Sequence, residues 1–247
     1  MLKVSKLSKK FDAIRAVDDL SFEILPGRIT SIIGPNGSGK TTTINLLTGL
    51  IPFDKGMVHI NGISLKKIKR SDMAHFGMTR TFQDVRLFEQ MTVIENMLVV
   101  LSERNVFGSL FDKHTKMHIA KAEDILEKVD LLKKKNDLAY NLSYGQRKLL
   151  EVARAYAMLS APINDTEVFL FDEPFAGLFP EMVKIISAIL VELRDMNKTV
   201  ILVEHDMDLV RKLSDHTIVM DGGKLLAEGT PHDVLSKASV VEAYLGK

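Results

Sequence analysis

Residues 34–42 read GPNGSGKTT and contain the pattern Gly-x-x-x-x-Gly-Lys-[Ser/Thr]. The preceding residues 29–33 have the β-branched composition of a buried strand, and residues 42–47 have helical spacing. Glycines let the backbone N–H groups of such a turn point inward, and the start of a helix adds a favourable dipole for an anion. The order of strand, glycine-rich turn and helix therefore predicts a phosphate cradle, the P-loop of a nucleoside triphosphate site.

Two side chains at the end of this loop have the chemistry of triphosphate binding. The Lys40 ammonium can reach the β- and γ-phosphates as a point charge, and the Thr41 hydroxyl is a ligand for Mg²⁺. The alternative is a glycine-rich turn with a chance lysine, but both flanking elements favour the cradle. The predicted nucleotide ligands in this stretch are Asn36, Gly37, Ser38, Gly39, Lys40, Thr41 and Thr42.

The composition is that of a globular protein with balanced charge. Of 247 residues 46% are apolar, and 33 Lys and Arg stand against 32 Asp and Glu, a net charge of +1. This balance gives no sign of a nucleic-acid partner, so we predict none. The chain has no cysteine, which excludes disulfides and thiolate metal sites and fits a reducing compartment. Its apolar runs predict neither a membrane span nor a secretion signal.

The hydrophobic pattern changes along the chain. Alternation at residues 2–5 and 16–24 predicts a half-exposed antiparallel sheet, which we expect residues 57–60 to join. Helical periodicity begins after residue 84 and continues to about residue 160, which predicts an inserted helical subdomain.

Continuous apolar strands return in the last third of the chain and predict a parallel core. They lie at residues 168–171, 199–203 and 217–220. The predicted fold is α/β, of the P-loop NTPase type. We expect a nucleotide-binding lobe with an antiparallel sheet at residues 1–83 and 161–247, and a helical subdomain at residues 84–160.

Residues 168–173 read VFLFDE, an apolar strand that ends in two carboxylates. Asp172 is expected at the carboxyl end of a parallel strand, where ligands bind in such sheets. A strand followed by a polar turn is common in α/β proteins, but the upstream P-loop makes this a Walker B arrangement. Asp172 would then hold Mg²⁺, and Glu173 would orient and deprotonate the attacking water as general base.

Two further polar residues are candidates for sensing the nucleotide. His205 follows the apolar run ILVE and is expected at another strand end, where an imidazole can donate to a γ-phosphate. Gln83 lies where the first lobe meets the helical stretch, and it can contact Mg²⁺ or the water and report the nucleotide state to the helices. The alternatives are a structural histidine and an ordinary surface amide.

Residues 142–146 read LSYGQ and precede a helix that carries the apolar residues Leu149, Val152 and Tyr156. Ser143 is a good helix N-cap. Its hydroxyl and the Gly145 N–H would also form an anion site at the start of that helix.

Together these motifs resemble the ATP-binding cassette (ABC) ATPase family along essentially the whole chain. The ordered set is GPNGSGKTT, Gln83, LSYGQ, VFLFDE and the histidine of EHD. The resemblance implies that Phe11 stacks on adenine and that Val17 lies near the ribose, although Phe11 as core packing is an alternative. It further implies that Ser143, Gly145 and Gln146 contact the nucleotide of a second copy.

The family's mechanism supplies the expected partners and location. Two ATPase subunits, identical or different, pair head to tail around ATP and Mg²⁺, and hydrolysis separates them. A short helix of a membrane permease would dock in a groove near Gln83, and an extracytoplasmic solute-binding protein would act indirectly. The chain is then expected in the cytoplasm, peripheral on the inner face of the cell membrane.

Residues 78–88 and 91–96, together with the EHDM run and the ending EAYLG, resemble the ATPase subunits of branched-chain amino acid importers. Residues 105–115 are similar to a longer loop of that group. Urea or amide importers and lipopolysaccharide-transport ATPases are alternatives. Another class is a soluble ABC ATPase that acts on DNA or ribosomes, but such proteins carry long insertions or tandem cassettes. A P-loop kinase would not explain LSYGQ.

Two positions depart from the family pattern. Residues 176–180 read AGLFP where the family has an acidic or amide residue before the proline, so Phe179 cannot make the expected polar contact across the dimer. Residues 161–167, APINDTE, are longer than the usual turn before Walker B.

Overall fold

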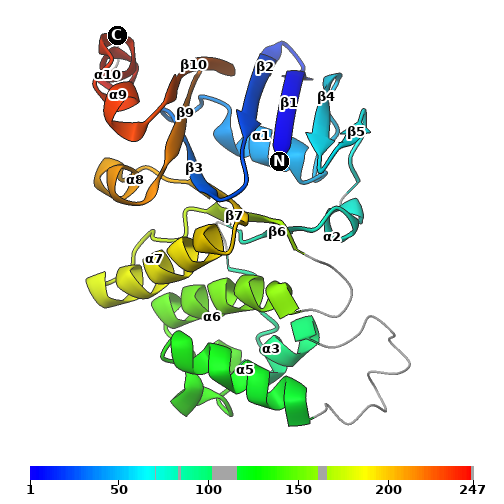
Figure 1. Ribbon diagram of the computed structural model, residues 1–247, viewed down its shortest axis with the longest axis vertical. Helices are drawn as coiled ribbons and strands as arrows, with labels where there is room; N and C mark the ends of the chain where they lie inside the picture. Colours follow the sequence, from blue (N-terminus) through cyan, green and yellow to red (C-terminus); the bar gives the residue numbers. More distant parts are fainter. Residues whose placement is uncertain (70, 83–84, 102–115, 161–165, 246–247) are drawn as a thin grey trace. The chain divides into compact units, whose positions relative to one another are not determined.

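The computed structural model of the protein describes residues 1–69, 71–82, 85–101, 116–160 and 166–245 (Figure 1). The chain forms two compact units. The first comprises residues 1–78, 167–173 and 190–247, and the second comprises residues 79–166 and 174–189. The division made from the sequence stays a prediction, and it did not assign residues 174–189 to the helical part.

The first unit contains a four-stranded antiparallel sheet with the order β2-β1-β4-β5 (Figure 1). Its strands are β1 (Leu2–Phe11), β2 (Ile14–Ile24), β4 (Lys55–Ile60) and β5 (Ile63–Leu65). Leu2 pairs with Ile24 on one side and with Ile60 on the other, and all three are fully buried. The alternation in the sequence thus gives one core face and one solvent face, as predicted.

The second sheet has the order β10-β9-β3-β8-β7-β6. Its strands are β3 (Arg28–Ile33), β6 (Met78–Arg80), β7 (Val168–Asp172), β8 (Thr199–Val203), β9 (His216–Asp221) and β10 (Lys224–Gly229). The pairs β3–β8, β3–β9 and β7–β8 are parallel, and β10 pairs antiparallel with β9 through a hairpin. Every residue of β7 and β8 is buried, so the predicted parallel core is confirmed.

Short helices complete the first unit. They are α1 (Lys40–Leu47), α2 (Asp72–His75), α8 (Met207–Leu213), α9 (Pro231–Leu235) and α10 (Ala238–Leu245). Asp206 caps α8 and Thr230 caps α9, each by accepting a hydrogen bond from a backbone N–H of the first turn. α1 begins directly after the glycine-rich turn, which places its N-terminus at the P-loop.

The second unit is helical. It contains α3 (Val93–Leu101), α5 (Lys116–Lys128), α6 (Tyr144–Ala157) and the short 3₁₀ turns Leu132–Lys134, Ala139–Asn141 and Met158–Ser160. α7 (Pro180–Asp195) begins in this unit, and its residues from 190 onward belong to the first. The apolar periodicity that predicted helices here is confirmed. The loop predicted at residues 105–115 and most of the lengthened turn at 161–167 lie outside the described residues.

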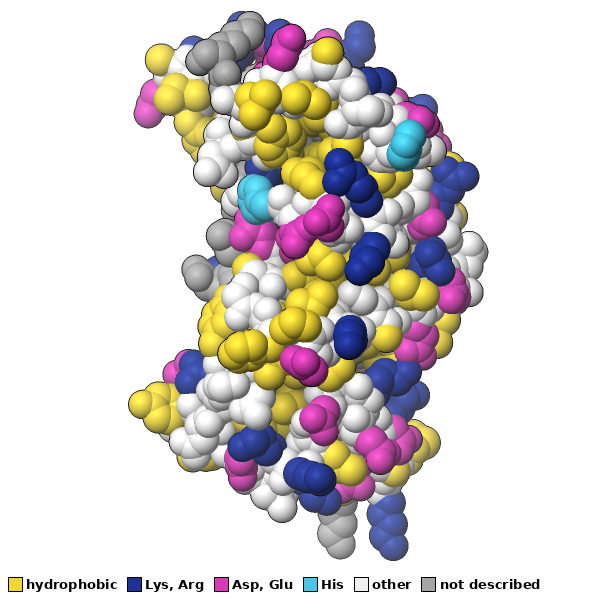
Figure 2. All heavy atoms as spheres, turned by 90° about the vertical axis from the view of Figure 1, so that its left-hand side faces the viewer, with side chains coloured by type: hydrophobic (Ala, Val, Ile, Leu, Met, Phe, Trp, Pro, Cys, Tyr) yellow, Lys and Arg dark blue, Asp and Glu magenta, His cyan; other side chains and the backbone are white. Residues whose placement is uncertain are grey.

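In the part of the chain that the structure describes, no helix is long and apolar enough to cross a membrane. Lys and Arg side chains are interspersed with Asp and Glu over the face drawn in Figure 2. This mixture agrees with a net charge of +1 and shows no single-sign patch on that face.

Candidate nucleotide and signature sites

The P-loop connects β3 to α1 in the first unit. Gly39, directly before α1, has φ +98, and a Cβ there would lie 2.4 Å from the backbone oxygen of Ala16. Only glycine therefore fits at this position. The loop closes on itself through a hydrogen bond from the Ser38 N–H to the Pro35 carbonyl, at 3.2 Å. The Ser38 hydroxyl is buried, and among the described residues no group hydrogen-bonds to it.

Lys40 points into this loop. Its Nζ donates to the carbonyls of Gly34 at 2.7 Å and Pro35 at 3.0 Å. Burial lowers the pKa of Lys40, and the negative charges of Glu173 and Asp172 oppose that shift. β3, which precedes the P-loop, pairs parallel with β8, and β8 pairs parallel with β7, so the P-loop and the two carboxylates follow strand ends at the same edge of one sheet.

The turn between β9 and β10 packs directly against the P-loop. The Gly223 N–H donates to the Ser38 carbonyl at 3.0 Å, and the Gly223 carbonyl accepts from the Asp18 N–H at 2.9 Å. The Asp18 carboxylate also lies 3.4 Å from the Lys224 ammonium. No sequence motif assigned this turn to the site.

Asp172 and Glu173 lie at the carboxyl end of β7, as predicted. Asp172 is 3% exposed. Glu173 has a left-handed backbone with φ +48, and its N–H donates to the Val203 carbonyl at 3.0 Å. This turn of the backbone directs its carboxylate toward His205, whose Nε2 lies 2.7 Å from Glu173 Oε1.

His205 follows β8, and its side chain is about two-fifths exposed, with 43% of its surface accessible. It is therefore no buried structural histidine. The His205 imidazole contacts the Glu173 carboxylate, and both residues belong to the same unit as the P-loop lysine, Lys40. Such a set can bind a polyphosphate and move a proton.

The donors suit Mg²⁺. Asp172 supplies a buried carboxylate and Thr41 an exposed hydroxyl, both hard oxygen ligands. Within the described residues there is no group of three or more His, Asp or Glu side chains placed to hold a metal. Mg²⁺ at triphosphate sites needs only one or two protein carboxylates, because substrate phosphates complete its shell. Gln83 lies outside the described residues.

The two residues expected at the base and ribose differ in exposure. Phe11 ends β1 and is 45% exposed, with the Lys9 ammonium 5.4 Å from the centre of its ring. It is therefore available to a planar ligand and does not pack in the core. Val17 is 1% exposed and packs in the core of the first unit. Asn36 is exposed and Thr42 is partly buried.

The LSYGQ motif lies in the second unit and forms a capping box at the start of α6. The Gln146 N–H donates to the Ser143 hydroxyl at 3.3 Å, and the Ser143 N–H donates to Gln146 Oε1 at 3.0 Å. A Cβ at Gly145 would lie 2.4 Å from the sulfur of Met182. Phe179 is 72% exposed, so its ring is presented to solvent rather than to its own unit.

Residues 17–176 match the family model described as ABC transporter. The chain belongs to the ABC transporter family. This confirms the resemblance drawn from the motifs, as well as the predicted fold class. As an ATP-binding cassette the chain binds and hydrolyses ATP.

Curated relatives match this cassette along its whole length. The high-affinity branched-chain amino acid transport ATP-binding protein LivG of Escherichia coli (strain K12) is 38% identical over 256 residues, covering 100% of the chain and 98% of the relative. BraF of Pseudomonas aeruginosa, of the same description, is 37% identical with the same coverage. A probable LivG of Archaeoglobus fulgidus is 38% identical and covered to 95%.

Solved structures agree with the fold. A nucleotide-free ATP-binding cassette from an ABC transporter superposes with a TM-score of 0.83 at 33% identity, covering 100% of this chain and 99% of the other. The ADP conformation of an ABC transporter cassette gives the same TM-score, identity and coverage.

Proposed function

We propose that this cassette is the ATP-hydrolysing subunit of an importer of branched-chain or other hydrophobic amino acids. The observation that carries the solute class is the end-to-end identity of 38% to proteins described as branched-chain amino acid transport ATP-binding proteins. Urea or amide importers, lipopolysaccharide transporters and soluble ABC ATPases are the alternatives, and no feature of the described residues favours them.

Hydrolysis would use the groups at the strand ends. Glu173 accepts a proton from the attacking water. His205 Nε2 lies 2.7 Å from Glu173 Oε1, and once ATP is bound the imidazole would donate to the γ-phosphate. Lys40 supplies positive charge at the β- and γ-phosphates. Mg²⁺, held by Thr41, Asp172 and Gln83, would neutralise charge on the phosphates when bound. Phe11 would stack on the adenine, because its ring is exposed.

A second ATPase subunit would complete the site. Ser143, Gly145 and Gln146 form a helix N-terminus, which favours an anion, and we assign it to the γ-phosphate bound by the partner. ATP then stabilises the closed pair more than ADP does, and this difference in affinity drives the conformational change. The partner ATPase is a second copy or a related chain.

The permease would dock on the second unit, beside the segment that follows Gln83. The Ala139 N–H donates to the Met91 carbonyl at 2.9 Å, so the segments around these two residues lie side by side. Both segments present exposed apolar side chains, namely Phe88, Met91, Leu138 and Tyr140. We assign this surface to a short helix of a permease, which places the chain on the cytoplasmic face of the membrane. An extracytoplasmic binding protein would deliver the solute to the permease.

The proposal is tested by substituting Glu173 with Gln. We expect ATP turnover to fall by at least ~100-fold, because a general base of this kind contributes about 10²–10⁴ in rate. The variant should form dimers in ATP that the unmodified chain does not accumulate. Turnover at the unmodified rate would contradict the role of Glu173. Purification of the chain from membranes with two hydrophobic permease subunits would support import, whereas co-purification with ribosomes or DNA would contradict it.

A further inference from the structure

One face of α6 carries four charged side chains. Arg147, Lys148, Glu151 and Arg154 follow each other at the spacing i, i+1, i+4 and i+7, which places them along one side of a helix. Lys148 is 1% exposed and Glu151 is 6% exposed. Burying charged groups is unfavourable unless they are paired and hydrogen-bonded, so these side chains need specific hydrogen-bond partners.

Those partners are backbone groups on both sides of Gln83. The Phe82 N–H donates to Glu151 Oε1 at 3.0 Å, and Lys148 Nζ reaches the Phe82 carbonyl at 3.5 Å. The Arg86 carbonyl accepts from Arg154 Nη1 at 2.7 Å. Three side chains of α6 thus hold the N–H and the C=O of Phe82 and the C=O of Arg86.

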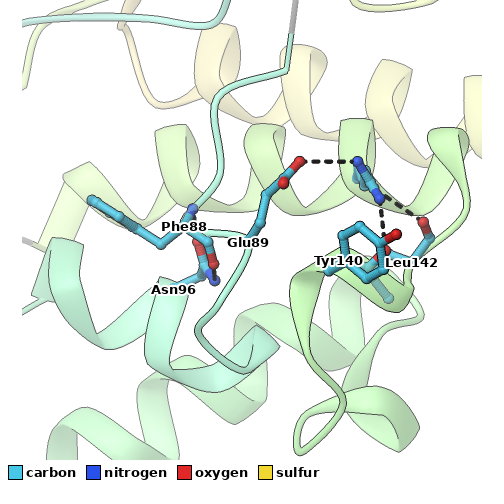
Figure 3. A network of polar contacts seen from close by, with 6 residues as sticks. Phe88, Glu89, Asn96, Tyr140 and Leu142 are labelled. Atoms are coloured by element: carbon cyan, nitrogen blue, oxygen red, sulfur yellow. Dashed lines mark hydrogen bonds and ion pairs between the residues drawn. The ribbon is translucent and has the colours of Figure 1, made fainter.

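The remaining member of the face, Arg147, connects the same segment to the signature motif (Figure 3). Its Nε donates to the Leu142 carbonyl at 3.1 Å and its Nη2 to the Tyr140 carbonyl at 2.6 Å. Its Nη1 lies 3.2 Å from Glu89 Oε1. One guanidinium therefore binds the chain that enters LSYGQ and the segment that follows Gln83.

A buried asparagine fixes the far end of this segment. Asn96 is fully buried; its Oδ1 accepts from the Phe88 N–H at 3.0 Å, and its Nδ2 donates to the Phe88 carbonyl at 3.0 Å (Figure 3). The Arg154 guanidinium also lies over the Phe88 ring, 5.1 Å from its centre. Arg86 and Phe88 are thus both held through backbone groups.

We propose that Arg147, Lys148, Glu151 and Arg154 are positioning residues that make the signature motif and the residues flanking Gln83 move as one body. The inference rests on the proposed function, in which Ser143 contacts the partner's nucleotide and Gln83 senses its own. These contacts are made to backbone groups, so they do not depend on the residue types at positions 82 and 86. A movement of α6 would therefore carry the backbone of both residues with it, whatever their side chains. Occupancy of one nucleotide site would in this way be communicated to the other.

A purely structural role for this face predicts something different. The face would then contribute only to the stability of the second unit, and every substitution that destabilises the unit equally would affect turnover equally. A positioning role predicts that turnover falls while ATP affinity is kept, because the P-loop belongs to the first unit. The separation of kcat from ATP affinity is therefore the deciding measurement.

The experiment uses the full chain and MgATP. In Glu151→Ala we expect kcat to fall about 10-fold, as for loss of one charged hydrogen bond worth about 1.4 kcal/mol, with the ATP Kd within about twofold. Glu151→Gln should recover most of the rate, because its amide oxygen still accepts the Phe82 N–H. Leu126→Ala, a fully buried position in α5, is the control for destabilisation. It should lower the melting temperature and leave kcat unchanged.

Arg147→Ala is the second test, because Arg147 is partly exposed and its loss leaves less charge buried than that of Glu151. It should show the same fall in kcat with unchanged ATP affinity, and it decides the question if Glu151→Ala does not fold. Unmodified turnover in the folded variants overturns the inference. An equal fall in the Leu126→Ala control also overturns it. Lack of ATP hydrolysis by the unmodified chain would instead overturn the proposed function.

Discussion

Gly222 and Gly223 form the tip of the β9–β10 hairpin and provide a matched pair of substitutions. Both have left-handed backbones, with φ +52 and +78. A Cβ at Gly222 would meet nothing within 4 Å, whereas a Cβ at Gly223 would lie 2.8 Å from the Ala16 oxygen and 3.1 Å from the Val17 Cα. The two alanine variants therefore share the backbone strain and differ in the collision with the strand beside the P-loop.

The expected loss of unfolding free energy follows from these contacts. A left-handed conformation costs a residue other than glycine about 1–2 kcal/mol, which is the whole expected effect of Gly222→Ala. In Gly223→Ala the turn must also move away from Ala16. That movement weakens the hydrogen bonds of Gly223 with Ser38, 3.0 Å, and with Asp18, 2.9 Å, each worth about 0.5–1.5 kcal/mol. The total is about 2–5 kcal/mol.

Denaturant unfolding and the binding of a fluorescent ATP analogue measure the two consequences. Gly222→Ala should keep its affinity for the analogue, and Gly223→Ala should lose about tenfold, since the Ser38 backbone would lose its support and about 1.4 kcal/mol changes a Kd by that factor. Equal losses of stability in the two variants, with unchanged nucleotide affinity in both, would refute the idea that this turn supports the P-loop.

Three further predictions concern other parts of the chain. Ser143→Ala removes the capping box and should lower stability by about 1 kcal/mol in denaturant unfolding, and it should weaken ATP-dependent dimerisation; unchanged dimerisation would contradict the role of Ser143. Burial raises the pKa of the Glu151 carboxyl above its ordinary value, so the folded chain keeps this proton to higher pH than the unfolded chain does. The stability of the unmodified chain should therefore fall relative to that of Glu151→Gln as pH rises from acid to neutral, and a constant difference in unfolding midpoints would contradict this. Burial raises the pKa of Tyr244 to about 12. Stability should therefore be lost as pH rises from 10 toward 12, and Tyr244→Phe should lose less over that range in alkaline unfolding curves.

Local pattern predicted most of the elements correctly. The β-branched run before the P-loop, the apolar strand before Asp172 and the spacing of α6 each depend on neighbours within a few residues. Ser143 was predicted as an N-cap for the same reason, because a cap bonds to N–H groups only three residues away. Asp172 was expected at the carboxyl end of a parallel strand, and it ends β7, which pairs parallel with β8.

The contacts that the sequence did not predict either join residues far apart in the chain or bury charged side chains. Gly223 and Ser38 are far apart in the sequence and meet only when the sheet has formed. A hairpin turn with two glycines has the same sequence pattern whether or not it supports another loop. Lys148 and Glu151 have the residue types of a solvated helix face, yet they are buried. The available signal was their position on the same helix as large apolar residues. Nothing in the sequence indicated the left-handed backbone of Glu173.

The backbone conformation of Glu173 lowers the stability of the fold at the position of the proposed general base. With φ +48 the residue occupies a conformation that glycine adopts freely and a glutamate adopts at a cost of about 1–2 kcal/mol. Selection for heat resistance alone would favour glycine or asparagine there, and it would remove the carboxylate that faces His205. If Glu173 is the general base that we propose, a thermostable form of this cassette has to gain its stability elsewhere, because the strained residue cannot be replaced without loss of turnover.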